Sequence, residues 1–235
     1  MLMRILALIL VLLGQPAVVL AQEIISARYG GPTRAYDHGI LGDKVEYTKL
    51  ILRVGPERRR VVIDVGEGHV FEDLEPLLAD LNGDGRPEVI TVRTNMQRGA
   101  SLAIYGVEGL ITQTPPIGAR YRWLAPVGVG DFDGDGRVEI AYVETPHLGK
   151  VLKIFGYFNR QLVLSAELGG LSNHRIGEDF ISGGVRNCGQ GDEIITADAS
   201  WQRVMLTRVR GGRLSSVPIG VTSQPRAFER AMNCQ

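Results

Sequence analysis

The chain predicts an all-β fold, a small β-propeller of about four or five four-stranded blades. Two nine-residue acidic loops, 80–88 and 131–139, share one spacing and start 51 residues apart. Each loop is followed by short β-branched and aromatic segments, which are typical of strands. A second strand then ends on an aromatic residue and glycine, at Tyr105-Gly106 and Phe155-Gly156. A repeat of this length built from strands fits one four-stranded blade better than a helical repeat.

The first 21 residues predict a secretory signal peptide. Arg4 precedes the apolar run 5–13, and the small-residue exit 19–21 comes just before Gln22. A membrane anchor is the competing interpretation, but Gly-Gln-Pro at 14–16 interrupts the apolar run well short of the ~20 residues that span a bilayer. No later segment is long enough. We therefore expect an exported protein, periplasmic or extracellular, without a membrane span.

Residues 22–235 predict a single domain of repeated units. The two units with acidic loops cover 76–118 and 119–170, and each has one strand before its loop and three after it. A third copy at 176–220 has Asn-Cys-Gly-Gln-Gly in place of the acidic turn, and a more distant copy covers 34–75. The units are aligned on four acids: Glu46, Glu88, Glu139 and Glu193.

The ends of the domain are assigned to closing the ring. Residues 27–34 and the segment 221–235 remain outside the four units, and we expect them to form a closure or a cap. The alternative is a fragment that completes its ring with another chain, because an open propeller exposes sheet edges.

The acidic loops predict two calcium sites. Oxygen-bearing side chains recur at offsets 0, 2, 4 and 8, with glycine at offset 5 and a backbone carbonyl at offset 6. Alternate oxygens in a tightly turning loop suit Ca²⁺, which takes about six to eight oxygen ligands, and the loops lack the Cys and His that zinc or copper prefer. Magnesium would demand tighter octahedral geometry. The predicted ligands are Asp80, Asn82, Asp84, the carbonyl of Arg86 and Glu88, and then Asp131, Asp133, Asp135, the carbonyl of Arg137 and Glu139.

Two other interpretations of the loops are weaker. An EF-hand needs a glutamate at offset 11, where this chain has Thr91 and Tyr142, and it needs a helix after the loop. Hairpin turns that bind nothing are the second alternative. Three or four carboxylates on one turn repel each other without a cation, so metal binding is favoured. Four carboxylates against three predict tighter binding at the second loop.

Cys188 and Cys234 predict a disulfide. They are the two cysteines of the chain, and an even pair in an exported protein is most simply a cross-link. It would tie the last residues to the third copy, which has a cysteine in place of the acidic turn. A reactive thiol or a metal site is the alternative, but there is no Cys-x-x-Cys spacing to support it.

The charge balance gives no reason to expect nucleic acid or an anionic membrane as a partner. The chain has 26 basic and 26 acidic residues, and removal of the leader takes away only Arg4. The basic cluster 58–60 follows Gly55-Pro56 and is interpreted as a solvated hairpin tip.

On the residues of these two loops, the chain resembles VCBS or FG-GAP repeat proteins, whose calcium-loop blades also build the integrin α-subunit propeller. The match is complete over residues 80–88 and 131–139, and weaker over much of 34–220. The resemblance implies Ca²⁺ in the hairpin between the first two strands of a blade. The Phe-Gly-Gly-Ala-Pro element is absent, and the mature chain is too short for the seven blades of the integrin case.

We expect a non-enzymatic module that binds a protein or glycan ligand, and six aromatic residues are candidates to line its groove: Tyr36, Tyr105, Tyr121, Trp123, Phe155 and Trp201. Trp123 and Phe155 stand on predicted strands, so packing between blades is favoured for them. The alternative function is a hydrolase or lyase with acid and base groups on one face, drawn from Asp37, His38, His147, His174 and Glu178. Against it, such loop residues commonly hydrogen-bond their own turns. A scaffold that acts through oligomerisation is the third hypothesis.

Overall fold

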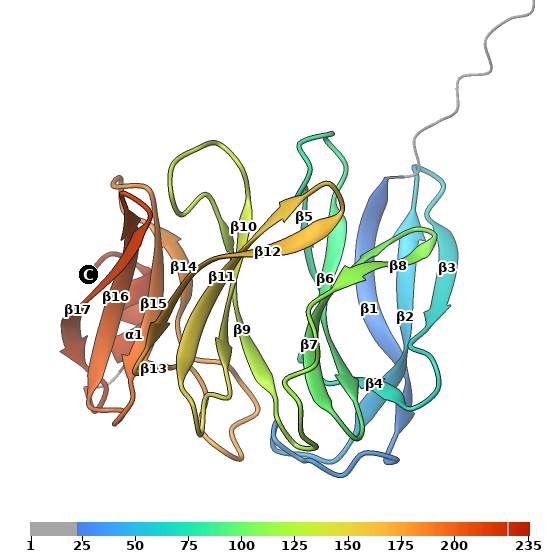
Figure 1. Ribbon diagram of the computed structural model, residues 1–235, viewed down its shortest axis with the longest axis horizontal. Helices are drawn as coiled ribbons and strands as arrows, with labels where there is room; N and C mark the ends of the chain where they lie inside the picture. Colours follow the sequence, from blue (N-terminus) through green and yellow to red (C-terminus); the bar gives the residue numbers. More distant parts are fainter. Residues whose placement is uncertain (1–22, 225) are drawn as a thin grey trace, which may run out of the picture.

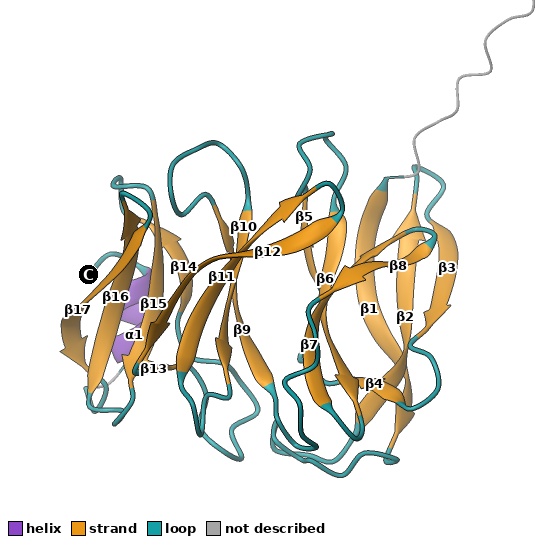
Figure 2. Ribbon diagram, viewed as in Figure 1, coloured by secondary structure: helices purple, strands orange, loops and turns teal. Residues whose placement is uncertain are grey.

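A computed structural model describes residues 23–224 and 226–235, so the predicted signal peptide lies outside the described residues. The described chain is built of strands, with one short helix and longer loops at the two ends of the strands (Figure 2). This confirms the all-β prediction. The elements are β1 (Ile24–Thr33), β2 (Glu46–Val54), β3 (Arg59–Asp64), β4 (His69–Phe71), β5 (Leu77–Ala79), β6 (Glu88–Asn95), β7 (Gly99–Gly106), β8 (Gly109–Gln113), β9 (Leu124–Gly130), β10 (Glu139–Glu144), β11 (Val151–Phe158), β12 (Gln161–Gly169), β13 (Leu171–Ser172), β14 (Gly184–Asn187), β15 (Asp192–Asp198), β16 (Arg203–Arg210), β17 (Arg213–Val221) and α1 (Ala227–Met232).

The strands form three hydrogen-bonded sheets. The first has eight strands in the order β1-β2-β4-β6-β7-β8, with β3 beside β2 and β5 beside β6. The second has four strands, β12-β11-β10-β9, and the third has five, β13-β15-β16-β17 with β14 beside β15. All of these pairings are antiparallel. Short hairpins join β6 to β7, β7 to β8, β11 to β12 and β16 to β17, which is the connection that antiparallel neighbours allow.

Three groups of strands repeat one meander, β5 to β8, β9 to β12 and β14 to β17. In each, an inner strand leads through a loop into a largely buried strand, and two further strands follow. In the second group the inner strand is one unbroken strand, β9. In the other two groups it is split, because β4 and β5 both pair with β6, and β13 and β14 both pair with β15.

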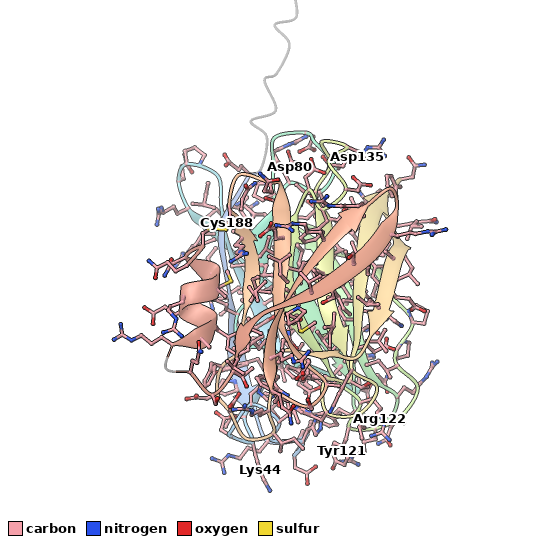
Figure 3. The ribbon with its side chains drawn as sticks, turned by 90° about the vertical axis from the view of Figure 1, so that its left-hand side faces the viewer. Lys44, Asp80, Tyr121, Arg122, Asp135 and Cys188 are labelled. Atoms are coloured by element: carbon pink, nitrogen blue, oxygen red, sulfur yellow. A yellow bond between two sulfur atoms is a disulfide. The ribbon has the colours of Figure 1, made fainter. Side chains whose placement is uncertain are left out.

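The first predicted unit, 34–75, differs from the structure. Most of the segment 27–34, assigned to a closure or cap, belongs to β1, which pairs with β2 along its length. In addition, β4 pairs with the strand after the first acidic loop. Glu46 begins β2 after the connection 34–45, and its neighbour Lys44 lies at the opposite end of the molecule from Asp80 and Asp135 (Figure 3). The alignment on Glu46 was therefore wrong: β1-β2-β3 correspond to β6-β7-β8, as their shared hairpin order shows.

The sheets follow one another in a row, from β1 to β3 at one end to β17 and α1 at the other (Figure 1). Apolar layers fill each gap. Leu50 and Leu52 of β2 pack toward Tyr105 of β7, and further layers join β6 and β7 to β9 and β10, and β10 and β11 to β15. Within residues 23–224 and 226–235, the first and last strands lie at opposite ends of this row (Figure 1), so the sheets do not close into a ring. The number of blades stays a prediction.

The far end of the row is covered by α1. Ala231, Phe228 and Met232 of this helix pack on Ile195 and Leu206 of the last sheet, where another sheet would otherwise stack. No helix in the described part of the chain has the length and apolar character needed to cross a membrane.

Two long loops connect the ends of the row. The connection 34–45 meets the insertion 173–183 that splits the last inner strand, and a side chain at Gly42 would lie 3.2 Å from the Gly177 carbonyl oxygen. Ile40 and Ile181 join the same apolar layer, which lies between the first and second sheets. The loops therefore bring residues of the first and last units together at one end.

Candidate metal centre

The two acidic loops lie at the same end of neighbouring sheets. The first connects β5 to β6 and the second connects β9 to β10. Figure 3 places Asp80 and Asp135 together at this end, with Cys188 of the third repeat nearby, and Tyr121 and Arg122 at the other end. The repeat thus positions three equivalent turns in one region of the molecule.

The first loop is curled around the Asp80 carboxylate. Its Oδ1 accepts the amide of Gly83 at 2.8 Å and its Oδ2 accepts that of Gly85 at 2.8 Å. Both glycines have positive φ, 77° and 81°, which a side chain would strain. Glu88, 8 % exposed, closes the loop by accepting from the Leu81 amide at 3.0 Å and from the Asn82 side-chain amide at 2.7 Å.

The second loop repeats this conformation with one more acid. Asp131 accepts the amides of Gly134 and Gly136 at 2.8 and 2.9 Å. The carboxylate oxygens of three predicted ligands lie within 4.8 Å of one another: Asp131, Asp133 and Asp135. Glu139 is 7 % exposed, and its Oε2 is buried without a hydrogen-bond partner. Asp133 stands where the first loop has Asn82, so no side-chain amide there donates to the glutamate.

Burial raises the pKa of both closing glutamates, and neighbouring loop acids raise it further: Asp84 and Asp80 for Glu88, and Asp133 for Glu139. A charged carboxylate is costly in such a place. Arg137, the basic residue of the second loop, pairs with Asp135, and among the described residues Glu139 has no ion pair that would hold it ionised. The donor set is all oxygen, and it fits a hard cation.

The strands beside the third turn supply two cationic side chains to its glutamate, Arg186 of β14 and Arg208 of β16. Glu193, fully buried, accepts from Arg186 Nε at 2.9 Å and from Arg208 Nε at 2.7 Å. It lies at the start of β15 as Glu88 and Glu139 lie at the start of β6 and β10. Two guanidinium groups therefore surround the carboxylate that has no acidic loop beside it.

The predicted disulfide between Cys188 and Cys234 is present. It joins the turn between β14 and β15 to the residues after α1, and Arg186 also donates to the Ala231 carbonyl of that helix. Sequence reasoning found the cysteines but missed Arg186, Arg208 and Asp192, whose Oδ2 accepts the Asp131 amide at 2.8 Å. These contacts bridge strands that are distant in the sequence, and no local pattern indicates them.

At the opposite end of the sheets, His38 contacts a carboxylate that sequence reasoning missed. His38 Nδ1 lies 2.5 Å from Glu72 Oε1. Glu72 is fully buried, and its Oε2 accepts from Thr94 Oγ1 at 2.7 Å. The Trp123 indole donates to the Glu72 backbone carbonyl at 2.8 Å. Glu72 therefore holds His38 near Trp123, the residue that precedes β9.

The other two candidate histidines bond each other. His147 Nε2 lies 3.0 Å from His174 Nδ1, and His174 Nε2 lies 2.9 Å from the Glu178 backbone carbonyl. Both rings pack on Trp123. Burial lowers the pKa of His147 to about 4 and also lowers that of His174, so both are neutral at pH 7. The structure thus gathers the three histidines, but only His38 meets a carboxylate side chain.

The aromatic candidates divide by exposure. Tyr36, Tyr105 and Trp123 are buried, and Trp123 and Phe155 belong to the layer between the first and second sheets, as expected for packing residues. Tyr121 is 37 % exposed and donates to Asp37 at 2.5 Å. A groove of six aromatic side chains is therefore not formed.

Glu46 lies at this same end and carries a testable pH effect. It is 4 % exposed, and burial, together with Glu72, Asp43 and Asp73, raises its pKa to about 9. The folded state then holds a proton that the unfolded chain releases near pH ~4.3, so stability falls as the pH rises from there toward 9. We expect Glu46→Gln to raise the free energy of unfolding by on the order of 5 kcal/mol at pH 8 and by little at pH 4.

Urea unfolding at the two pH values measures this effect. Glu57→Gln, in the exposed turn between β2 and β3, is the matched control and should change neither value. Equal stabilisation by Glu46→Gln at both pH values would show that its charge is not the cause.

Comparison with known proteins identifies one repeat. Residues 80–142 match the family model described as an FG-GAP-like repeat, a segment that runs from the first acidic loop through the second to β10. The resemblance to FG-GAP repeat proteins is thereby confirmed over these residues. No curated protein matches the chain.

Proposed function

From the FG-GAP-like repeat at residues 80–142, we propose that this protein is an exported, calcium-stabilised module of propeller-type blades that binds a protein or glycan without catalysing a reaction. Ca²⁺ is held in the two acidic loops by the side chains of Asp80, Asn82, Asp84 and Glu88, and of Asp131, Asp133, Asp135 and Glu139, with the carbonyls of Arg86 and Arg137. Each cation stabilises the turn between an inner strand and the buried strand that follows it.

One observation carries the proposal: Glu139 Oε2 is buried without a partner beside three converging aspartates. The equivalent Glu193 is neutralised by two arginines. A buried carboxylate needs such a charge, and in the second loop a bound cation would supply it.

Calorimetric titration with Ca²⁺ tests the proposal. We expect two sites with dissociation constants in the ~0.1–1 mM range of extracellular modules, the second loop binding more tightly because it has one more carboxylate. Asp133→Ala should remove the tighter site and Asp84→Ala the weaker one. Each loaded site should also raise the melting temperature by mass action.

Asp64→Ala is the control, since this acid is exposed on β3 outside both loops. It should bind calcium as the unaltered protein does. Neither heat nor a shift in melting temperature on calcium addition would refute the proposal.

Export is supported by the signal-peptide pattern at the N-terminus and by the disulfide, which persists in oxidising compartments. We favour ligand binding over catalysis because of the hydrogen-bond partners of the histidines. His147 and His174 bond each other and a backbone carbonyl, as structural histidines do, and only the contact of His38 with Glu72 favours a hydrolase or lyase.

A further inference from the structure

A small cavity lies among the loops at the end of the strands opposite the acidic loops, where Figure 3 places Tyr121. His38 lines it from the connection 34–45, and His147 lines it from the connection between β10 and β11. Its volume is about 20 Å³, which accommodates one water molecule or one metal ion. Two rings that border so small a space lie beside each other. Accordingly, the pKa of His147 is lowered by burial first, and then by His174 and by His38.

The hydrogen bonds of the two rings determine which nitrogen carries the proton. His38 Nδ1 donates to Glu72 Oε1 at 2.5 Å, so the lone pair of a neutral His38 lies on Nε2. The Glu178 backbone carbonyl can only accept, so His174 Nε2 donates to it and His174 Nδ1 is an acceptor. His147 Nε2 therefore donates to His174 Nδ1 at 3.0 Å, and the lone pair of His147 lies on Nδ1. Each ring thus retains one nitrogen that can bind a metal ion.

Both rings are held as metal-binding histidines are. Such histidines almost always donate their second N–H to a carboxylate, a carbonyl or a water molecule, which fixes the orientation of the ring. His38 donates to the carboxylate of Glu72. His147 donates to His174, which is itself anchored to a backbone carbonyl, and its ring stacks on Trp123. The two lone pairs are therefore oriented before any ion arrives.

The charges near His38 favour a cation. Glu72 is fully buried, and its carboxylate forms an ion pair with His38. Glu46 lies in the same region, and burial followed by the charge of Glu72 raises its pKa to about 9. A buried carboxylate needs a positive charge beside it. At His38 this charge is either a proton on Nε2 or a metal ion on the same atom.

The backbone is strained around the same cavity. Thr145 and Tyr121 line it together with the histidines, and their φ angles are 45° and 62°. A positive φ is unfavourable for a β-branched residue such as Thr145. The Thr145 carbonyl accepts from the amides of Leu148 and Lys150 at 2.8 and 3.0 Å, and these bonds hold the turn that carries His147. Strain of this kind gathers at ligand sites.

We propose that His38 Nε2 and His147 Nδ1 bind one divalent transition-metal ion, Zn²⁺, Cu²⁺ or Ni²⁺, in this cavity. Imidazole nitrogen suits these ions, whereas Ca²⁺ takes oxygen ligands, so the site differs from the acidic loops in its metal as well as in its place. Two protein ligands leave the other coordination positions to water. The ion joins the connection 34–45 to the turn after β10, and the proposal does not depend on calcium in the acidic loops.

Calorimetric titration with Zn²⁺ tests the proposal. The protein carries no polyhistidine tag, and calcium is present in excess so that the acidic loops are filled. We expect one zinc ion per chain. His38→Gln and His147→Gln should each weaken zinc binding by about a hundredfold, because each removes one of the two protein ligands.

His69→Gln is the matched control, because both ring nitrogens of His69 are engaged elsewhere. Nδ1 lies 2.7 Å from the Glu67 carbonyl and Nε2 lies 3.1 Å from the Asn95 side-chain amide. This variant should bind zinc as the unaltered protein does. Electron paramagnetic resonance of the copper-loaded, unaltered protein is a second measurement, and it requires no variant to fold. It should show coupling of the copper to imidazole nitrogen.

The proposal is overturned if zinc gives no heat, if either His38→Gln or His147→Gln binds zinc like His69→Gln, or if copper is coordinated by oxygen alone. Asp133→Ala is titrated with zinc as well. Loss of zinc binding in this variant would place the ion in the second acidic loop and overturn the histidine site. Absent calcium binding with intact zinc binding would overturn the proposed function alone and leave the histidine site supported.

Discussion

Replacement of Cys188 and Cys234 together by serine should lower the free energy of unfolding by about 4 kcal/mol. The cross-link closes a loop with a sequence separation of 46, and the chain-entropy model gives this magnitude for such a loop. Most of the effect should appear at the end of the row, because the disulfide holds α1 against the last sheet. Loss of this attachment frees Phe228 and Met232 from the apolar layer and exposes Ile195 and Leu206.

Urea unfolding of the double variant, with and without reducing agent, measures the change. The variant should be insensitive to reductant, and the reduced unaltered protein should match it. Increased binding of a hydrophobic dye before global unfolding would report release of α1. A variant within 1 kcal/mol of the oxidised protein would contradict this role for the disulfide.

The features that the sequence predicted are those that depend on residues close together in the chain or on its composition. The curl of the loop 80–88 requires glycines where φ is positive and an acid whose carboxylate accepts their amides, so this turn could be predicted without a partner elsewhere in the chain. Calcium binding by the turn stays a prediction. The disulfide followed from there being one pair of cysteines. The strands after each loop followed from their β-branched composition.

The parts that were missed depend on long-range packing. Glu72 meets His38 across 34 residues, and Arg208 meets Glu193 from the next strand, so neither contact leaves a pattern in a short window. The alignment of the first unit was wrong because Glu46 resembles the closing glutamates in position but follows a connection at the opposite end of the strands. Ring closure depends on the angles between sheets and on α1 covering the last one, and strand patterns do not encode these.

Glu193→Gln should lower the free energy of unfolding by about 3–5 kcal/mol, the usual effect of breaking a buried ion pair. The carboxylate is fully buried, and the side chains of Arg186 and Arg208 are 11 % and 29 % exposed. A neutral amide leaves both guanidinium groups without their counter-charge, and it weakens the anchor that Arg186 makes to the Ala231 carbonyl. Because this charge pair is internal, the loss should be the same with and without calcium.

Glu139→Gln is the matched comparison, since Glu139 opens β10 as Glu193 lies at the start of β15. Without calcium, its Oε2 has no partner to lose, so the change in the free energy of unfolding should be within about 1 kcal/mol. With calcium at a hundredfold excess over its dissociation constant, a loaded site adds about 2.7 kcal/mol, and Glu139→Gln should forfeit much of this. Urea unfolding of both variants with calcium and with chelator makes the comparison. If calcium changes the loss of unfolding free energy by the same amount in both variants, then the guanidinium groups at Glu193 and the cation at Glu139 do not play equivalent roles in the repeat.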